Sequence, residues 1–346
     1  MKLFSVLWKK KKYLIGFLIT VIFTWLAFGN LNLTALLNIF INANPFWIIV
    51  GLGFLAADYV LRIIRWWLML RFSAHDLPFT VCTGPYLASI ALNNILPFRI
   101  GDVVRAVGFQ KQLGLSPMVI IGTMVIERLF DLFALLTVFL ITLNNINIDN
   151  ISSYFVRISY WVVLVCLLSL LLIIFIHLWF KRWVTSIVGM AKARKWRLLE
   201  RMAFGMCQFF DSLLLIRSKL LVIELLILSF MAWFLEGAMF AAVAKALSII
   251  NISSGPWFSL VIGTLATLMP STPGYIGTFD YFTKIGIMTF GVSQELGTVF
   301  ALIVHIVLWA PLTLVGIIWL LLPAGRSVFK IISLRRGSEV FNEKNS

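Results

Sequence analysis

Apolar runs of about twenty residues recur along almost the whole chain, and this feature limits the fold more than any other. Each run is long enough to cross a hydrocarbon core of about 30 Å as an α-helix. Of the 346 residues, 61% are hydrophobic and 12% are charged, against about 45–50% and about 25% in soluble domains. This composition excludes a water-soluble globular enzyme, a disordered tail and a fibrous protein. It predicts an all-α polytopic membrane protein.

Six of the apolar segments are continuous, and two regions are interrupted by Pro, Gly or Asn. The continuous segments cover residues 13–28, 46–70, 117–143, 160–180, 220–247 and 298–322. The interrupted regions cover residues 78–96, followed by Pro97, and residues 256–291, which contain Pro270 and Pro273. Non-helical backbone inside a membrane must be lined by protein or water. We therefore expect about six full transmembrane helices and two re-entrant helical hairpins.

Positive charge is confined to alternate loops. Lys and Arg cluster before residue 13, at 62–111, at 181–219 and after 322, whereas the loops at 30–45, 144–154 and 249–254 have none. Because cytoplasmic loops carry the excess of Lys and Arg, both termini are predicted to be cytoplasmic. The first hairpin then enters from the cytoplasm and the second from outside. Residues 192–218 are expected to form an amphipathic helix on the cytoplasmic surface.

The net charge of +15 fits basic loops beside anionic lipid, and we expect no binding to nucleic acid. The three Cys and three His are scattered, so no disulfide framework, metal site or cofactor is predicted. We find no serine-hydrolase, P-loop or zinc-protease motif, and expect no catalytic residue. The chain is interpreted as one cell-membrane domain, residues 1–325, followed by a basic and polar cytoplasmic tail, residues 326–346.

The two interrupted regions share a short pattern, in which Pro is followed four residues later by Gly. It reads PFRIG from Pro97 and PGYIG from Pro273, and each follows a span with an acidic residue. Two such units of opposite orientation are typical of the inverted repeats of transporters. The alternative is that Pro and Gly only kink two spans. The candidate helix-break residues are Pro97, Gly101, Pro270, Pro273, Gly274 and Gly277.

Ionisable residues inside apolar segments are costly, and each needs a partner. Asp58, Arg62 and Arg65 are spaced to share one helix face, and Asp58 precedes Arg62 in the orientation that favours a pair. Glu127 and Asp131 carry like charge one turn apart and need a cation between them. We expect Arg128 to serve one of them, and Arg99 or Arg105 the other. These groups form either a polar cavity or a buried network that only fixes helix packing.

The first hairpin contains the most informative run, residues 93–105. It combines two Asn, a helix break, a flexible Gly, an acid and two Arg. Arg99 and Arg105 have a planar fork that suits phosphate, and a helix that starts near Asp102 offers free N–H groups to an anion. The alternative is an ordinary cytoplasmic loop with a capping Asp.

The second hairpin is polar and has no Arg. It offers Thr272, Tyr275 and Asp280, and Glu236 lies in the preceding span. Freed carbonyl groups there suit a polar head group or a cation. Lys284 is placed to pair with Asp280 at one-turn spacing, and His305 reads as a satisfied buried histidine.

Three ordered motifs resemble the lysylphosphatidylglycerol synthase transmembrane region, also called the flippase-like domain family. Residues 93–105 are similar to its N-x-x-L-P-x-R-x-G-E-x-x-R pattern, residues 127–131 to E-R-x-x-D, and residues 270–280 to P-x-x-P-G-x-x-G-x-x-E. Residues 62–67 are similar to its R-x-x-R-W motif. The resemblance covers nearly the whole chain. It departs at Asp102 and Asp280, where the family commonly has Glu.

Family members that make lysylphosphatidylglycerol carry a C-terminal soluble transferase domain, and residues 323–346 are too few for one. The resemblance therefore implies movement of a polar-headed lipid between leaflets, and not lysyl transfer. Because some relatives are fused to or neighbour glycosyltransferases, glycolipids and polyprenyl-phosphate lipids are also candidate substrates.

We thus expect a lipid translocase of the flippase type that acts on a phospholipid or a lipid-linked intermediate. Two alternatives stay open: a membrane-embedded aminoacyl or glycosyl transferase with Asp102 or Glu127 as base, and a scaffold for a separate lipid-modifying synthase or glycosyltransferase. A homodimer through a Phe-rich face is also left open. The candidate substrate-binding residues are Arg62, Arg65, Asn93, Asn94, Arg99, Asp102, Arg105, Glu127, Arg128, Asp131, Glu236, Thr272, Tyr275 and Asp280.

Overall fold

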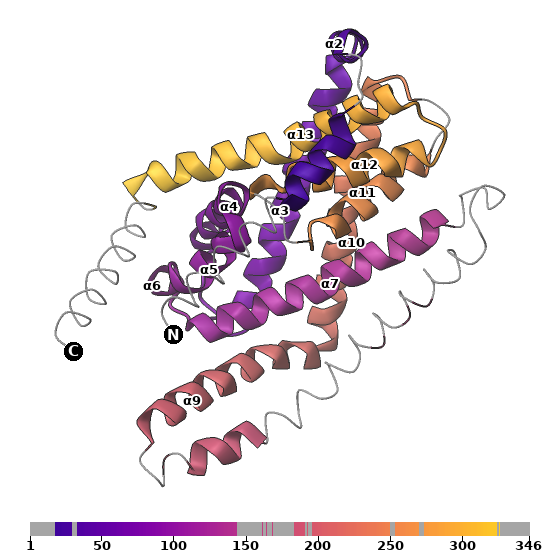
Figure 1. The fold of residues 1–346 in the computed structure, drawn as a ribbon. Helices are drawn as coiled ribbons and strands as arrows, with labels where there is room; N and C mark the ends of the chain where they lie inside the picture. Colours follow the sequence, from indigo (N-terminus) through magenta and orange to yellow (C-terminus); the bar gives the residue numbers. More distant parts are fainter. Residues whose placement is uncertain are drawn as a thin grey trace.

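Helices make up all the regular structure in the described part of the chain (Figure 1). The computed structural model describes residues 18–29, 33–143, 183–190, 196–249, 253–269 and 273–323, with residues 161, 164, 168, 192 and 325. The predicted all-α membrane fold is confirmed. Most of the predicted span at 160–180, the tail at 326–346, and the residues Pro270 and Thr272 lie outside the described residues.

Three described helices are long and apolar enough to cross a membrane: α3 (Pro45–Arg71), α10 (Lys219–Ala246) and α13 (Gln294–Leu321). The helix α7 (Pro117–Leu143) has the same length as α3 and carries an internal charge cluster. All four coincide closely with predicted segments, although α13 begins at Gln294 instead of residue 298. The full set of six crossings stays a prediction.

Local signals explain where the long helices begin. The side chain of Asn44 accepts a hydrogen bond from the Phe46 amide, and Pro45 occupies the first turn of α3. Ser293 caps α13 in the same way through the Leu296 amide. One short element was not expected: α2 (Leu33–Ile41) occupies the uncharged loop before α3.

The first hairpin is built from α4 (Phe79–Ile95), the single turn η1 (Pro97–Arg99) and α5 (Ile100–Val107), which precede α6 (Gln110–Leu113). Leu96 is extended and Arg99 is left-handed, with φ of 52°. The chain thereby reverses, and α5 packs back along α4. A Cβ at Gly101 would overlap the Ser89 carbonyl oxygen, so this helix contact requires glycine.

The second hairpin consists of α11 (Gly255–Ala266), η4 (Pro273–Tyr275) and α12 (Thr278–Met288). Gly274 and Gly277 have φ of 70° and 84°, which only glycine adopts freely. The two helices pack closely because Gly263 lies against Thr283, and Gly286 against Ser259.

A polar layer divides the core. One apolar cluster contains Leu55, Leu135 and Phe240, and the other contains Trp66, Ile126 and Leu225. Buried charges on α3, α7 and α10 lie between them, near the middle of each helix. Asp58, for example, stands thirteen residues from each end of α3. A helix centred on the bilayer would therefore carry these charges at the midplane.

Helix packing follows a two-fold pattern. The helices α3 and α10 run side by side through the centre of the bundle (Figure 1), while α4 packs on α13 and α11 packs on α7. If α3 corresponds to α10, α4 to α11 and α7 to α13, then the α4–α13 contact corresponds to the α11–α7 contact, and the α3–α10 contact corresponds to itself. Two related units would give this arrangement, and the inverted repeat stays a prediction.

The helix α9 (Arg197–Ser212) and the turn η3 (Leu213–Arg217) occupy most of the segment predicted as an amphipathic helix. The helix packs beside α7 (Figure 1). It exposes Leu198, Met202 and Phe204 while it buries Ala203 and Phe210. Its location on the cytoplasmic surface remains a prediction.

Candidate functional site

Arg62 lies at the centre of a buried ion network that joins three helices. Its Nε donates to both carboxylate oxygens of Asp58, at 2.7 and 3.0 Å. Its Nη2 donates to Glu236 Oε2 on α10 at 2.6 Å, and its Nη1 lies 3.9 Å from Asp131 on α7. The predicted Asp58–Arg62 pair therefore exists, and it extends to acids that the local spacing does not reveal.

Arg65 supplies the cation that the acids of α7 need. Its guanidinium donates to both oxygens of Asp131, at 2.7 and 3.2 Å, and lies 3.5 Å from Glu127. Arg105 from the first hairpin binds the other side of Glu127 at 2.8 Å. The prediction of Arg105 as a partner is thus correct, whereas the assignment of Arg128 to this pair is wrong. Arg128 lies instead 3.6 Å from Asp102, and 48% of its side chain is exposed.

Aromatic and hydroxyl groups complete this network. The Arg105 guanidinium stacks 3.9 Å from the centre of the Trp66 ring and 4.3 Å from that of Tyr86. The Tyr86 hydroxyl donates to Glu127, and the Trp233 indole donates to Asp131. These partners were missed by sequence reasoning. Of these three aromatic residues, Trp66 could have been found from the sequence, because it belongs to the R-x-x-R-W motif.

The arrangement has a consequence for ligand binding. Arg62, Arg65 and Arg105 are each at most 7% exposed and paired to carboxylates. A phosphate would have to break a buried ion pair to reach any of them, and leaving one buried charge unpaired costs about 3–5 kcal/mol. In this conformation the three arginines hold helices together.

The tips of the two hairpins meet. Arg99 Nε donates to the Tyr275 hydroxyl at 3.0 Å, and its Nη2 lies 3.4 Å from the carbonyl and hydroxyl oxygens of Thr267. Asn94 donates to Thr313 on α13 at 2.8 Å, and its carbonyl accepts from the Trp309 indole. Predicted residues from both hairpins are therefore brought together. Their partners Thr267, Trp309 and Thr313 were not predicted, because no motif or spacing marks them.

A cavity of about 180 Å³ lies where the tips meet. Glu236, 9% exposed, lines it, as do Tyr275 and Thr267, which are the partners of Arg99. The cavity thus has a carboxylate in its wall, and two of its lining residues are hydrogen-bonded to a guanidinium group. The complete lining is Tyr59, Asn94, Glu236, Thr264, Thr267, Gly274, Tyr275, Phe279, His305, Leu308 and Trp309.

The remaining candidates have local roles. Asn93 exchanges two hydrogen bonds with Asp102, through its amide nitrogen at 2.9 Å and its amide oxygen at 3.1 Å. Asp280 accepts from the Gly277 amide at 2.8 Å and lies 2.7 Å from His305 Nδ1. The predicted Lys284–Asp280 pair is wrong, because Lys284 donates to the Ala27 carbonyl.

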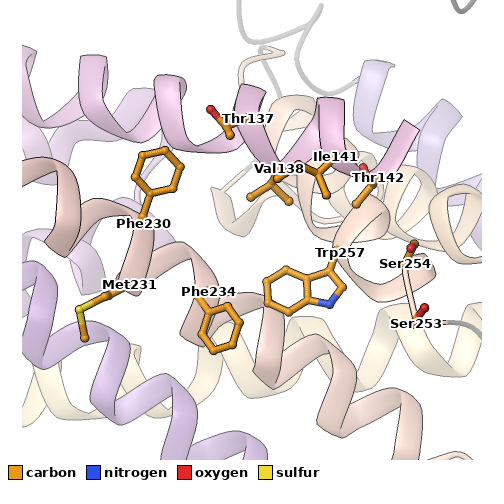
Figure 2. A pocket seen from close by; sticks show the side chains of 10 residues that line it. All are labelled: Thr137, Val138, Ile141, Thr142, Phe230, Met231, Phe234, Ser253, Ser254 and Trp257. Carbon is orange, nitrogen blue, oxygen red and sulfur yellow. The ribbon is translucent and has the colours of Figure 1, made fainter. Parts of the chain in front are cut away.

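A larger pocket of about 550 Å³ lies between α7, α10 and the start of α11. Figure 2 shows Phe230, Phe234 and Trp257 around it, with Val138 and Ile141 on α7. Its other lining residues are Met231 and the hydroxyl-bearing Thr137, Thr142, Ser253 and Ser254. Because no charged side chain lines it, it suits apolar chains better than a charged head group.

Comparison with known proteins identifies the relatives of this chain. The family described as the lysylphosphatidylglycerol synthase TM region matches residues 13–316. A UPF0104 membrane protein of Methanocaldococcus jannaschii is 28% identical over 192 residues, which are 55% of this chain and 76% of that protein. No solved structure matches.

Proposed function

The chain belongs to the lysylphosphatidylglycerol synthase transmembrane family, and from that membership and the cavity geometry we propose that it moves a polar-headed lipid between membrane leaflets. The polar head would pass through the cavity at the hairpin tips. The acyl chains would stay in the bilayer. No covalent step is required.

The observation that carries this proposal is the cavity between the tips, near mid-helix. Pockets for drug-sized ligands have about 300–1,000 Å³, so a cavity of about 180 Å³ suits a phosphate or a small head group. A polar site at this depth is expensive to maintain in a membrane and is seldom kept without a function.

Arg99 is the residue best placed to receive a phosphate. Its hydrogen-bond partners, Tyr275 and Thr267, are neutral, so it can exchange them for phosphate oxygens without breaking an ion pair. The planar fork of arginine then allows two parallel hydrogen bonds. This revises the expectation for Arg105, Arg62 and Arg65, whose guanidinium groups are already occupied.

Glu236 offers the opposite charge in the wall of the cavity. A carboxylate there would select an ammonium or hydroxyl group on the head. The site would thus recognise a head group through the positive charge of Arg99 and the negative charge of Glu236. A purely anionic lipid would contact Arg99 alone.

Passage between leaflets requires the seam between the hairpins to open. Arg99 closes this seam through Tyr275 and Thr267, and Asn94 holds the first hairpin to α13 through Thr313 and Trp309. We place the protein in the cell membrane with both termini in the cytoplasm. A synthase or glycosyltransferase that makes the lipid would be its partner.

The test is reconstitution of the full chain in liposomes that contain fluorescent zwitterionic, anionic or lysyl-modified lipids. Dithionite quenching then reports how much inner-leaflet probe becomes accessible. We expect wild type to expose it, Arg99→Ala to reduce the rate at least tenfold, and the exposed Arg128→Ala to remain close to wild type.

Three results would contradict this function or its assigned site. Rates equal to those of empty liposomes for every lipid would exclude translocation of these lipids. A change in lipid mass after addition of a lipid-linked donor would instead indicate the transferase alternative. Full activity of Arg99→Ala would remove the assigned phosphate site.

A further inference from the structure

The buried ion network does not balance. Its carboxylates belong to Asp58, Glu127, Asp131 and Glu236, and its guanidinium groups to Arg62, Arg65 and Arg105. Among the described residues of this network, one negative charge is in excess. An uncompensated charge inside a protein or membrane is strongly unfavourable. Arg99 is another nearby cation, because its partners line the same cavity as Glu236, but among the described residues it forms no ion pair with this network. A further positive charge in direct contact with the network would therefore balance it.

The hydrogen-bond partners of the four carboxylates show which of them lacks a positive charge. Glu127 is bound by Arg105 and Tyr86, with Arg65 at 3.5 Å. Asp131 is bound twice by Arg65 and once by Trp233. Both oxygens of Asp58 accept from Arg62.

Glu236 is held less completely. Within the described residues, its hydrogen-bond partner is Arg62 alone, which binds Oε2 and is shared with Asp58. Glu236 is also the acid of this network that lines the cavity. A positive charge can therefore reach it from the cavity, whereas Asp58 is completely buried.

The cavity geometry favours a proton over a metal ion. A hard cation needs about six oxygen ligands at once. Among the described residues, no group of three or more His, Cys, Asp or Glu side chains is placed to hold a metal ion. A proton needs one free carboxylate oxygen, and Oε1 provides it.

We infer that Glu236 is a reversible proton-binding site, which is occupied when the cavity is empty. The proton neutralises the excess charge of the network. Under the proposed function, on which this last step rests, a cationic part of a head group displaces the proton from Glu236, so that lipid entry releases one proton into the cavity.

Other charged or titratable groups face the same region and must be separated from Glu236. The helices α3, α7, α12 and α13, the first hairpin and the turn η4 contribute them, whereas α11 has none. They are Asp58, Tyr59, Arg62, Arg65, Tyr86, Arg99, Arg105, Glu127, Asp131, Tyr275, Asp280 and His305.

The direct test is infrared difference spectroscopy of the full chain in nanodiscs, titrated from about pH 5 to about pH 9 without substrate. We expect wild type to lose the C=O stretch of a protonated carboxyl group as the pH rises. Glu236→Gln should lack this band. Glu224→Gln should retain it, because Glu224 is an exposed acid on the same helix.

Thermal unfolding gives a second readout that needs no transport. Deprotonation restores the excess charge, so the wild-type Tm should fall by several degrees over the same pH range, and the Tm of Glu236→Gln should change less. A band retained in Glu236→Gln would overturn the assignment. The assignment would also be overturned if the wild-type Tm rose with sodium chloride but not with choline chloride, because that would indicate a bound metal cation. Neither result would bear on lipid movement itself.

Discussion

At the scale of single residues, the arginines fall into two groups according to their hydrogen-bond partners. Arg62, Arg65 and Arg105 are bound to buried acids, whereas Arg99 is bound to hydroxyl and carbonyl groups. Helical spacing predicted the Asp58–Arg62 pair because both residues lie one turn apart. It could not predict the Arg65–Asp131 pair, which depends on how α3 and α7 pack.

Replacement of Arg65 should therefore destabilise the fold. Arg65→Met leaves Asp131 and Glu127 without their shared cation, and the free energy of unfolding should fall by about 3–5 kcal/mol. Thermal unfolding in detergent measures this loss. Arg128→Met is the control, because an exposed pair such as Arg128–Asp102 contributes about 1 kcal/mol or less. If Arg65→Met lowered the free energy of unfolding no more than Arg128→Met does, the buried network would not stabilise the fold as argued.

At the scale of elements, the sequence located both hairpins through their Pro and Gly residues. The helices α7 and α10 also began and ended close to their predicted limits, because long apolar runs mark them. The role of Gly101 was different from that expected. It was predicted as a flexible break, but it lies inside α5 and permits close contact with α4.

Gly101→Ala should weaken the first hairpin. The added methyl group would overlap the Ser89 carbonyl oxygen and crowd Asn93, so α5 must move away from α4. We expect a fall in Tm of several degrees and reduced translocation. Gly53→Ala is the matched control, since a Cβ there meets nothing within 4 Å and alanine favours the helix. A Gly101→Ala protein as stable as Gly53→Ala would contradict the packing argument.

At the scale of the whole molecule, the paired contacts of α4 with α13 and of α11 with α7 are those expected of two related units, whose opposite orientation stays a prediction. The short PFRIG and PGYIG patterns pointed to this relation. They could not supply the contacts, because tertiary packing brings together residues more than 150 positions apart, as in the Arg99–Tyr275 hydrogen bond.

Opposite orientation predicts that the open ends of the hairpins face different sides. In a variant without native cysteines, Lys111→Cys should be labelled by a membrane-impermeant maleimide only after the cells are opened. Gln294→Cys should be labelled in intact cells. Both positions are exposed. Labelling of both from the same side would exclude the inverted arrangement.

The buried lysine on α12 has a consequence for how the two hairpins are fastened. Lys284 binds the Ala27 carbonyl, and Gly277 lies against Thr24, so the helix Leu18–Phe28 braces the second hairpin. In the described residues, the first hairpin is held differently: Asn94 donates to Thr313 on α13, and Arg105 forms a buried ion pair with Glu127 on α7. The two hairpins are therefore fastened by unlike contacts, a carbonyl group in one case and an ion pair in the other. Their attachments should respond differently to pH and salt, although the helices they join are alike in shape.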